Sequence, residues 1–244
     1  DISGIGASPT KFSSGIADGA ALIVNGVSTL NLTDNTFTDN QEAILVGDGN
    51  ALPQTMTLTG NTFTNNAYDI QLAGGTGAGT LNFGAGNNFI SGAQTQQHLL
   101  WGGTSDIDMT QVEFDGKLGS QMSNDELFAT EDLITDGLDN AAYGFARLKT
   151  GNVYVTAASG SIQNALDVAS SGDTVNVQAG TYGAFGKVSG DPSNVTIQTT
   201  EGAVIDGSVL PADKRIVELS GDGMTFSGFT INGTGAGVGI SIDG

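Results

Sequence analysis

Short runs of alternating apolar and polar residues recur along the first third of the chain. The runs "LNLT", "MTLT" and "LNFG" begin at Leu30, Met56 and Leu81, and each is followed by a turn that contains Asn and then by Phe. Alternation with a period of two predicts strands, and the Gly, Asn and Asp residues between the runs predict tight turns. We therefore expect many short strands rather than a helical fold.

The turn sequences repeat with almost no change. "NTFTDN" at residues 35–40 returns as "NTFTNN" at residues 61–66, 26 residues later, and a further step of 26 leads to "NNF" at residues 87–89. A fixed period of this length predicts stacked coils of two or three strands, which is the architecture of a parallel β-helix. Like side chains then stack on like, with a polar ladder at the turn and an apolar column inside. The predicted ladder comprises Asn35, Asn61, Asn87, Phe12, Phe37, Phe63, Phe89, Ile205 and Ile231.

The same period continues if the two ends of the chain are joined. Joining Gly244 to Asp1 places Phe12 midway between Ile231 and Phe37, at nearly the step that separates the other repeats. Neither terminus carries a helix, a proline cluster or a charge-rich cap, whereas soluble proteins normally block exposed strand edges. We expect the Asp1 end of one copy to stack on the Gly244 end of the next, as a homopolymer or as tandem copies.

A helical stretch interrupts the strands in mid-chain. Ser123 and Glu126 form a capping-box pattern, which predicts a helix over residues 124–136. "GNVYVT" predicts a strand at residues 152–156, and a second short helix is expected after Ser161.

The sequence "SIQNALDVASSGDTVNVQAGTY" at residues 161–182 resembles the opening of right-handed parallel β-helix domains of the pectin-lyase-like superfamily. In that family an amphipathic helix plugs the end of the barrel, and the strands of the first coil follow it. The preceding residues look like the connector in large secreted bacterial surface proteins that carry tandem β-helix repeats. The resemblance implies an all-β, right-handed parallel β-helix with a helical connector in mid-chain.

This resemblance also suggests a division of the chain. Residues 1–116 would end one β-helix, residues 117–160 would form the connector, and residues 161–244 would form the capping helix and first coils of the next. The implied function is a structural repeat of an extracellular fibre, adhesin stalk or surface layer at the bacterial cell surface. The alternative is a carbohydrate-active lyase or hydrolase, or a carbohydrate-binding module, because the fold hosts both kinds of protein.

Charge narrows the set of partners. The chain has 7 Lys and Arg against 26 Asp and Glu, a formal net charge of −19, which repels nucleic acid and anionic membrane surfaces. It has no cysteine, and no apolar run is long enough to insert into a membrane. We expect no binding to nucleic acid and no membrane insertion, and the expected partners are further copies of the chain and cell-surface glycans.

Few residues offer catalytic chemistry. His98 is the only histidine and falls beyond the regular coils, while the arginines are Arg147 in the connector and Arg215. Polygalacturonase-like and pectate-lyase-like sites would need clustered acids with nearby basic groups. Arg215 is expected to face solvent near Asp213 and Glu218, with a catalytic role as the alternative, which Asp206→Ala or Arg215→Ala would test by loss of turnover. His98 and Trp101 are expected to be buried at the end of a solenoid, with a carbohydrate platform as the alternative. We expect no catalytic residue and no required cofactor.

Calcium is the one metal ion that the sequence supports. Asp48 and Asp222 lie in Gly-rich turns, and Asp243 meets Asp1 at the joined ends, so each offers oxygen ligands that suit a hard cation. None matches an EF-hand loop, and the alternative is that they are solvated turn residues. The acidic residues between 125 and 139 are expected to form a solvated helix face, and calcium binding is the alternative.

Overall fold

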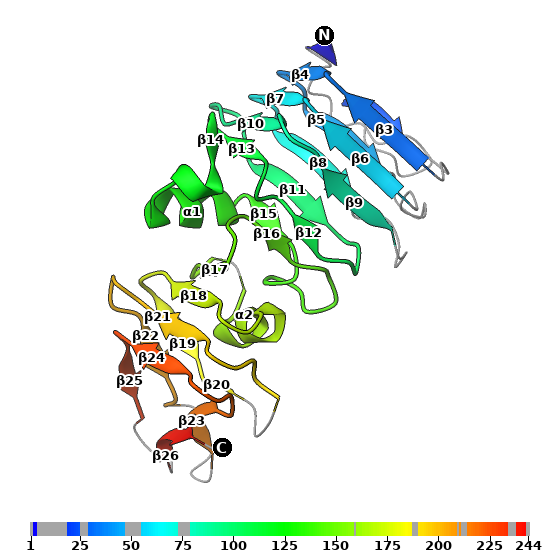
Figure 1. Cartoon of the computed structure of the whole chain (residues 1–244). Coiled ribbons are helices and arrows are strands. Elements are labelled where there is room, and N and C mark those ends of the chain that lie inside the picture. The colour runs from blue at the N-terminus through cyan, green and yellow to red at the C-terminus, as the bar shows by residue number, and fades with distance from the viewer. Residues whose placement is uncertain are drawn as a thin grey trace. The chain divides into compact units, whose positions relative to one another are not determined.

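The chain folds into a parallel β-solenoid of about seven turns with two short α-helices in mid-chain, and 45% of the described residues lie in strands and 9% in helices. The predicted all-β parallel solenoid is thus confirmed. The computed structural model describes residues 2–3, 19–24, 29–46, 55–72, 79–158, 160–186, 190–208, 210, 214–233 and 238–242. Two compact units share the chain, one of residues 1–137 and 141–149 and the other of residues 138–140 and 150–244 (Figure 1).

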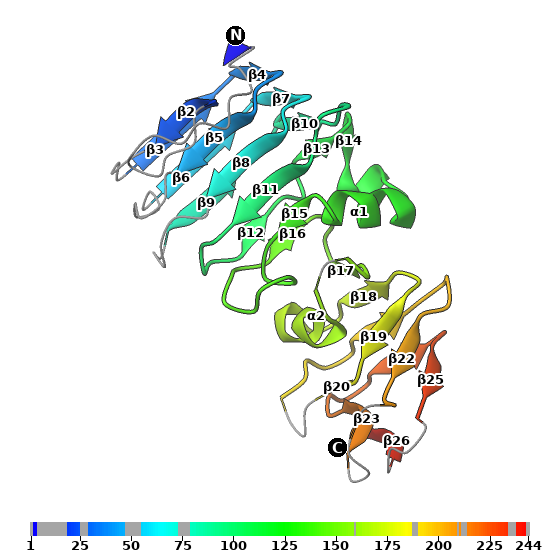
Figure 2. The ribbon, with the colours of Figure 1, turned by 180° about the vertical axis from the view of Figure 1, so that it is seen from behind.

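The first unit has three larger sheets and one separate pair of strands, and each of the first three coils contributes one strand to each of the larger sheets (Figure 2). The first sheet comprises β1 (Ile2–Ser3), β4 (Thr36–Thr38), β7 (Thr62–Thr64), β10 (Asn88–Ile90) and β13 (Glu113–Phe114), with β14 (Lys117–Leu118) antiparallel at its edge. The second comprises β2 (Ala20–Val24), β5 (Glu42–Val46), β8 (Tyr68–Leu72), β11 (Gln97–Trp101) and β15 (Ile134–Thr135). The third comprises β3 (Thr29–Thr33), β6 (Thr55–Thr59) and β9 (Thr80–Phe83), and a separate pair joins β12 (Ile107–Asp108) to β16 (Ala146–Arg147).

A column of phenylalanine side chains runs through the core of the first unit. Phe37 pairs with Phe63, Phe63 with Phe89, and Phe89 with Phe114. The rings stack, with centroids 5.1 Å apart between Phe37 and Phe63 and 4.8 Å apart between Phe63 and Phe89. Each stacked ring buries a large apolar area at the same position of its coil. The period of Phe in the sequence is therefore the length of one coil.

The start of the column differs from the sequence expectation. Ile2 of β1 takes the place opposite Phe37 in the register. Phe12, which we expected there, lies outside the described residues.

The first helix is shorter than expected. α1 (Asn124–Glu131) begins after Ser123, whose hydroxyl accepts from Glu126 N, and the predicted capping box is present. The helix ends at Glu131 rather than at residue 136, because Ile134 and Thr135 pair with Leu99 and Leu100 as strand β15. A short 3₁₀ helix, η1 (Gly119–Gln121), precedes it.

The second unit repeats the three-sheet plan with its own helix. α2 (Ile162–Val168) follows the predicted cap Ser161 and buries Ile162, Ala165 and Leu166. One sheet comprises β17 (Asn152–Val155), β18 (Thr174–Val177), β21 (Thr196–Gln198) and β24 (Thr225–Ser227). The others comprise β19 (Thr181–Gly183), β22 (Val204–Asp206) and β25 (Thr230–Asn232), and β20 (Phe185–Gly186), β23 (Arg215–Leu219) and β26 (Val238–Ile242).

Coil length varies more in the second unit than in the first. Ile205 pairs with Ile231, which is the same step along the chain as from Phe37 to Phe63. Other steps are shorter, as between Thr174 and Thr196, or longer, as between Phe185 and Val217. The strands keep their register while the loops absorb the difference in length. Within the described residues, no helix is long and apolar enough to span a membrane.

Candidate functional site

Asparagine side chains connect neighbouring coils of the first unit. Asn35 Nδ2 donates to Asn61 Oδ1 at 3.0 Å, and Asn61 Nδ2 donates to Asn87 Oδ1 at 3.1 Å. A second ladder, which the sequence analysis did not single out, joins Asn40 Nδ2 to Asn66 Oδ1 at 3.0 Å. Of these side chains, Asn40, Asn61, Asn66 and Asn87 are buried, where an unpaired polar group would be costly, and Asn35 is half-buried.

The second ladder leads to a buried acid and the single histidine. Asn66 Nδ2 donates to Asp69 Oδ1 at 2.8 Å, and Asp69 Oδ2 lies 2.6 Å from His98 Nδ1. His98 Nε2 in turn lies 3.2 Å from the hydroxyl of Ser91. Asp69 and His98 are each 1% exposed, whereas Ser91 is exposed. The three side chains therefore form a continuous Asp–His–Ser chain from the core to the surface.

The electrostatics of Asp69 reflect this burial. Loss of water raises the pKa of Asp69 above its ordinary value of 3.8, while the contacts with His98 and Asn66 act in the opposite direction. When Asp69 is ionised, Nδ1–H of His98 donates to it, and Nε2 is then the ring atom that accepts from the Ser91 hydroxyl.

A longer loop brings Asp69 and His98 together. Residues 91–96 join β10 to β11, whereas only residues 65–67 join β7 to β8. The two partners are consequently 29 positions apart instead of 26, and His98 falls next to Asp69 in the neighbouring strand. His98 lies in β11, a strand of a regular coil, so its expected place beyond the coils is wrong. Its ring packs against Phe89, with centroids 5.4 Å apart.

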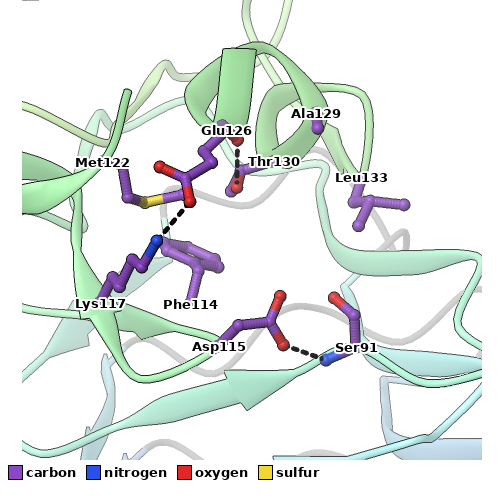
Figure 3. A pocket seen from close by; sticks show the side chains of 9 residues that line it. All are labelled: Ser91, Phe114, Asp115, Lys117, Met122, Glu126, Ala129, Thr130 and Leu133. Atoms are coloured by element: carbon purple, nitrogen blue, oxygen red, sulfur yellow. Dashed lines mark hydrogen bonds and ion pairs between the residues drawn. The ribbon is translucent and has the colours of Figure 1, made fainter. Parts of the chain in front are cut away.

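A small pocket of about 160 Å³ opens beside Ser91 (Figure 3). The β13–β14 hairpin and α1 build its other walls. Asp115 and Gly116 turn the hairpin with φ values of 50° and 75°, the left-handed conformations that a two-residue Asp-Gly turn requires. Its lining residues are Ser91, Phe114, Asp115, Lys117, Met122, Glu126, Ala129, Thr130 and Leu133.

The polar groups around the pocket are already engaged with one another. Ser91 N donates to Asp115 Oδ1 at 2.8 Å, and Gly92 N donates to Thr95 Oγ1 at 3.0 Å. Lys117 Nζ forms an ion pair with Glu126 of α1. The site therefore has a hydroxyl, a base and an orienting acid, but the two amides at the hydroxyl are not free to stabilise an oxyanion.

The first described coil of the first unit and the last described coil of the second unit present a different kind of surface. Among the described residues, the exposed large hydrophobic side chains are Ile23 (37% exposed), Ile240 (45%) and Ile242 (77%). Ile23 lies in β2, an edge strand at the start of the first unit, and the other two lie in β26, an edge strand at the end of the second.

Inward-facing positions are also less buried in these end coils. Leu22 of β2 is half-buried, although its partner Ile44 is 0% exposed. Ile231 of β25 is half-buried, whereas its partner Ile205 is 0% exposed. The end coils therefore carry core side chains that the described residues leave partly uncovered.

The predicted calcium ligands are not brought together by the described residues. Asp1, Asp48 and Asp243 lie outside them, and Asp222 is exposed in the turn before β24. No group of three or more His, Asp or Glu side chains within the described part of the chain is arranged to hold a metal ion. Calcium binding stays a prediction.

The acidic stretch around α1 differs from the solvated face that the sequence predicts. Glu131 and Asp136 are buried, at 1% and 0% exposure. Asp136 Oδ2 accepts from Ala146 N at 2.6 Å, so this carboxylate satisfies a buried backbone amide.

Trp101 is buried and Arg215 is exposed, as the sequence predicts. Trp101 is 1% exposed and its Nε1 donates to Ser105 O at 2.8 Å, so it presents no platform to solvent. Arg215 is exposed and pairs with Glu218 on the same strand, β23. Arg147 lies over the ring of Phe145, 5.2 Å from its centroid.

Sequence reasoning missed Asp69 and Ser91 for a physical reason. A strict period of 26 aligns Asp69 with Thr95, and the longer loop before β11 hides its contact with His98. A usable signal existed in β8, because Asp69 occupies the position of Ala43, which is buried in β5. A polar residue at such a position requires a partner.

Comparisons of the chain with protein-family models, with curated proteins and with solved structures find no match. The resemblance of residues 161–182 to pectin-lyase-like openings therefore stays a prediction.

Proposed function

We propose that this chain is a structural module of an extracellular fibre, adhesin stalk or surface layer, in which further copies of the same module cover its end coils. The observation that carries the proposal is the apolar exposure at both described ends. Ile23, Ile240 and Ile242 are exposed there, while the large apolar side chains of the intervening described coils are buried or half-buried.

An end coil favours another coil as its partner because of its backbone as well as its side chains. Among the described strands, β2 and β26 each pair with a single neighbour, β5 and β23, so the other side of each strand is a sheet edge with backbone groups along it. A parallel coil placed on that side would pair these groups and would cover the half-buried Leu22 and Ile231. Full burial of one such side chain contributes about 2 kcal/mol. The resemblance of the mid-chain helix and first coil to secreted tandem β-helix proteins supports the same role.

The proposal predicts self-association that depends on the end coil. Sedimentation velocity and negative-stain electron microscopy of the purified chain should show concentration-dependent oligomers or linear particles. The double variant Ile240→Lys, Ile242→Lys adds charge to the exposed edge strand and should shift the protein towards monomers. Because both side chains are already exposed, the circular dichroism spectrum should not change.

A matched control places the same two charges elsewhere. Asn82 and Thr104 are exposed positions away from the described ends, and the double variant Asn82→Lys, Thr104→Lys should associate like the unmodified chain. A chain that stays a monodisperse monomer at all concentrations, with or without calcium, would contradict the proposal.

A further inference from the structure

We propose that Ser91 is a nucleophile, activated by His98 and oriented through Asp69, that accepts an acyl group from small activated esters. The three side chains have the connectivity that acyl transfer requires. A hydroxyl at the surface lies 3.2 Å from an imidazole nitrogen, and the other ring nitrogen lies 2.6 Å from a buried carboxylate. A separation of 3.2 Å is at the upper end of hydrogen-bond reach, as is common for such pairs without a ligand.

The proposed reaction balances without any further reagent. Ser91 Oγ attacks the carbonyl carbon of the ester, and its proton passes to His98 Nε2. The bond between that carbon and the leaving oxygen breaks, and the proton on His98 passes to the leaving alcohol. The products are acyl-Ser91 and the free alcohol, while Asp69 stabilises the imidazolium that exists between the two proton transfers. Water can later hydrolyse the acyl group.

The surroundings fix the base and the acid in place. Asp69 receives a hydrogen bond from Asn66, which is itself bonded to Asn40 of the preceding coil. The ring of His98 packs against Phe89 and Phe114, with centroid separations of 5.4 Å and 5.8 Å. A reactive group supported by regular strands in this way is held more precisely than one on a loop.

The pocket indicates the class of substrate. A volume of about 160 Å³ is below the usual range for drug-sized ligands, so the acyl group must be small. Phe114, Met122 and Leu133 give the pocket apolar walls. Asp115 beside Ser91 disfavours an anionic substrate, and it favours a neutral ester of acetyl or propionyl size.

The engaged amides determine the rate that we expect. Ser91 N and Gly92 N already donate to side chains, so the tetrahedral intermediate lacks preformed donors. Loss of a single such donor lowers kcat by a factor of roughly 10² to 10³ in serine hydrolases. Acylation of Ser91 should therefore be slow and close to stoichiometric, with the acyl form accumulating instead of turning over rapidly.

The test is covalent labelling of the full chain with p-nitrophenyl acetate and, separately, with a fluorophosphonate. Peptide mass spectrometry should place one adduct on Ser91, and Ser91→Ala should abolish it. Ser120 is another exposed serine and serves as the internal comparison. Ser91 should be labelled at least about tenfold faster than Ser120, and Ser120→Ala should leave the Ser91 adduct unchanged.

The role of His98 is tested by pH as well as by mutation. Labelling of Ser91 should slow as pH falls from about 8 to about 5, because a protonated imidazole cannot accept the serine proton. His98→Gln, checked for native circular dichroism, should slow labelling to the rate of Ser120. The pH profile stands on its own if that variant does not fold. Labelling of Ser91 no faster than Ser120, or independent of pH across this range, would overturn the proposal.

Discussion

At the scale of single residues, Asn61 shows how the solenoid satisfies a buried amide. Its Oδ1 accepts from the backbone and side-chain nitrogens of Asn35 at 3.0 Å. Its Nδ2 donates to Leu32 O at 2.8 Å and to Asn87 Oδ1 at 3.1 Å. One side chain thus bonds to the coil on either side, and this explains why the sequence repeats Asn at this turn.

The first prediction follows from these bonds. Asn61→Ala should lower the free energy of unfolding by about 3 kcal/mol, because it leaves several buried partners of Asn61 without their hydrogen bonds. Chemical denaturation would measure the change. Asn82→Ala, at an exposed position on β9, should change the same quantity by less than about 0.5 kcal/mol. Equal effects of the two substitutions would show that the ladder does not stabilise the fold.

The repeat predicted the residues that stack, but not the residues that meet across a change of period. Asn35, Asn61 and Asn87 recur at a constant step, so simple counting places them in contact. Asp69 and His98 are 29 residues apart, and their contact depends on the length of the loop at residues 91–96, which no periodic pattern specifies.

At the scale of elements, α1 is held at its start by local polar contacts. Glu126 Oε2 accepts from Ser123 N at 2.8 Å, and its other oxygen pairs with Lys117 of β14. These contacts, with Lys117 as the largest cause, lower the pKa of Glu126 from 4.5 to about 2. The sequence pattern predicted the capping box correctly. It did not predict where the helix ends, because the end depends on the pairing of Ile134 with Leu99 in the neighbouring strand.

A pH-dependent contribution to stability follows from Glu126. Because its pKa is lower in the folded chain than in the unfolded chain, the contribution is fully present above about pH 4.5 and is lost as pH falls towards 2. The difference in melting temperature between the unmodified chain and Glu126→Gln should therefore shrink over this range. Lys117→Met should show the same convergence. A difference that is constant from pH 6 to about pH 2.5 would contradict this assignment.

At the scale of the whole molecule, strong negative charge and open apolar edges act against each other. The net charge of −19 opposes association between copies, while the exposed isoleucines of β2 and β26 favour it. Composition and repeat pattern were sufficient to predict the parallel solenoid. They were not sufficient to predict which residue of β1 pairs with Phe37 of β4. That residue is Ile2, which lies outside the period of the later repeats.

Calcium would act at this scale by offsetting the negative charge. If turn aspartates such as Asp222 hold calcium in the folded chain, excess EGTA should lower the melting temperature, because a ligand that binds only the folded state stabilises it. Differential scanning calorimetry in calcium and in EGTA would measure the shift, with magnesium as the control for general screening of charge. An unchanged melting curve in excess EGTA would contradict calcium binding by the folded chain.

The stacked register of the first unit has a mechanical consequence. Bonds between neighbouring coils, such as the amide bonds from Asn35 to Asn61 and from Asn61 to Asn87, run along the stacking direction. A pull in that direction would load the coils in series and release them one at a time. Each released coil of 26 residues would add about 85 Å of extended chain, so the solenoid would lengthen in steps before it came apart.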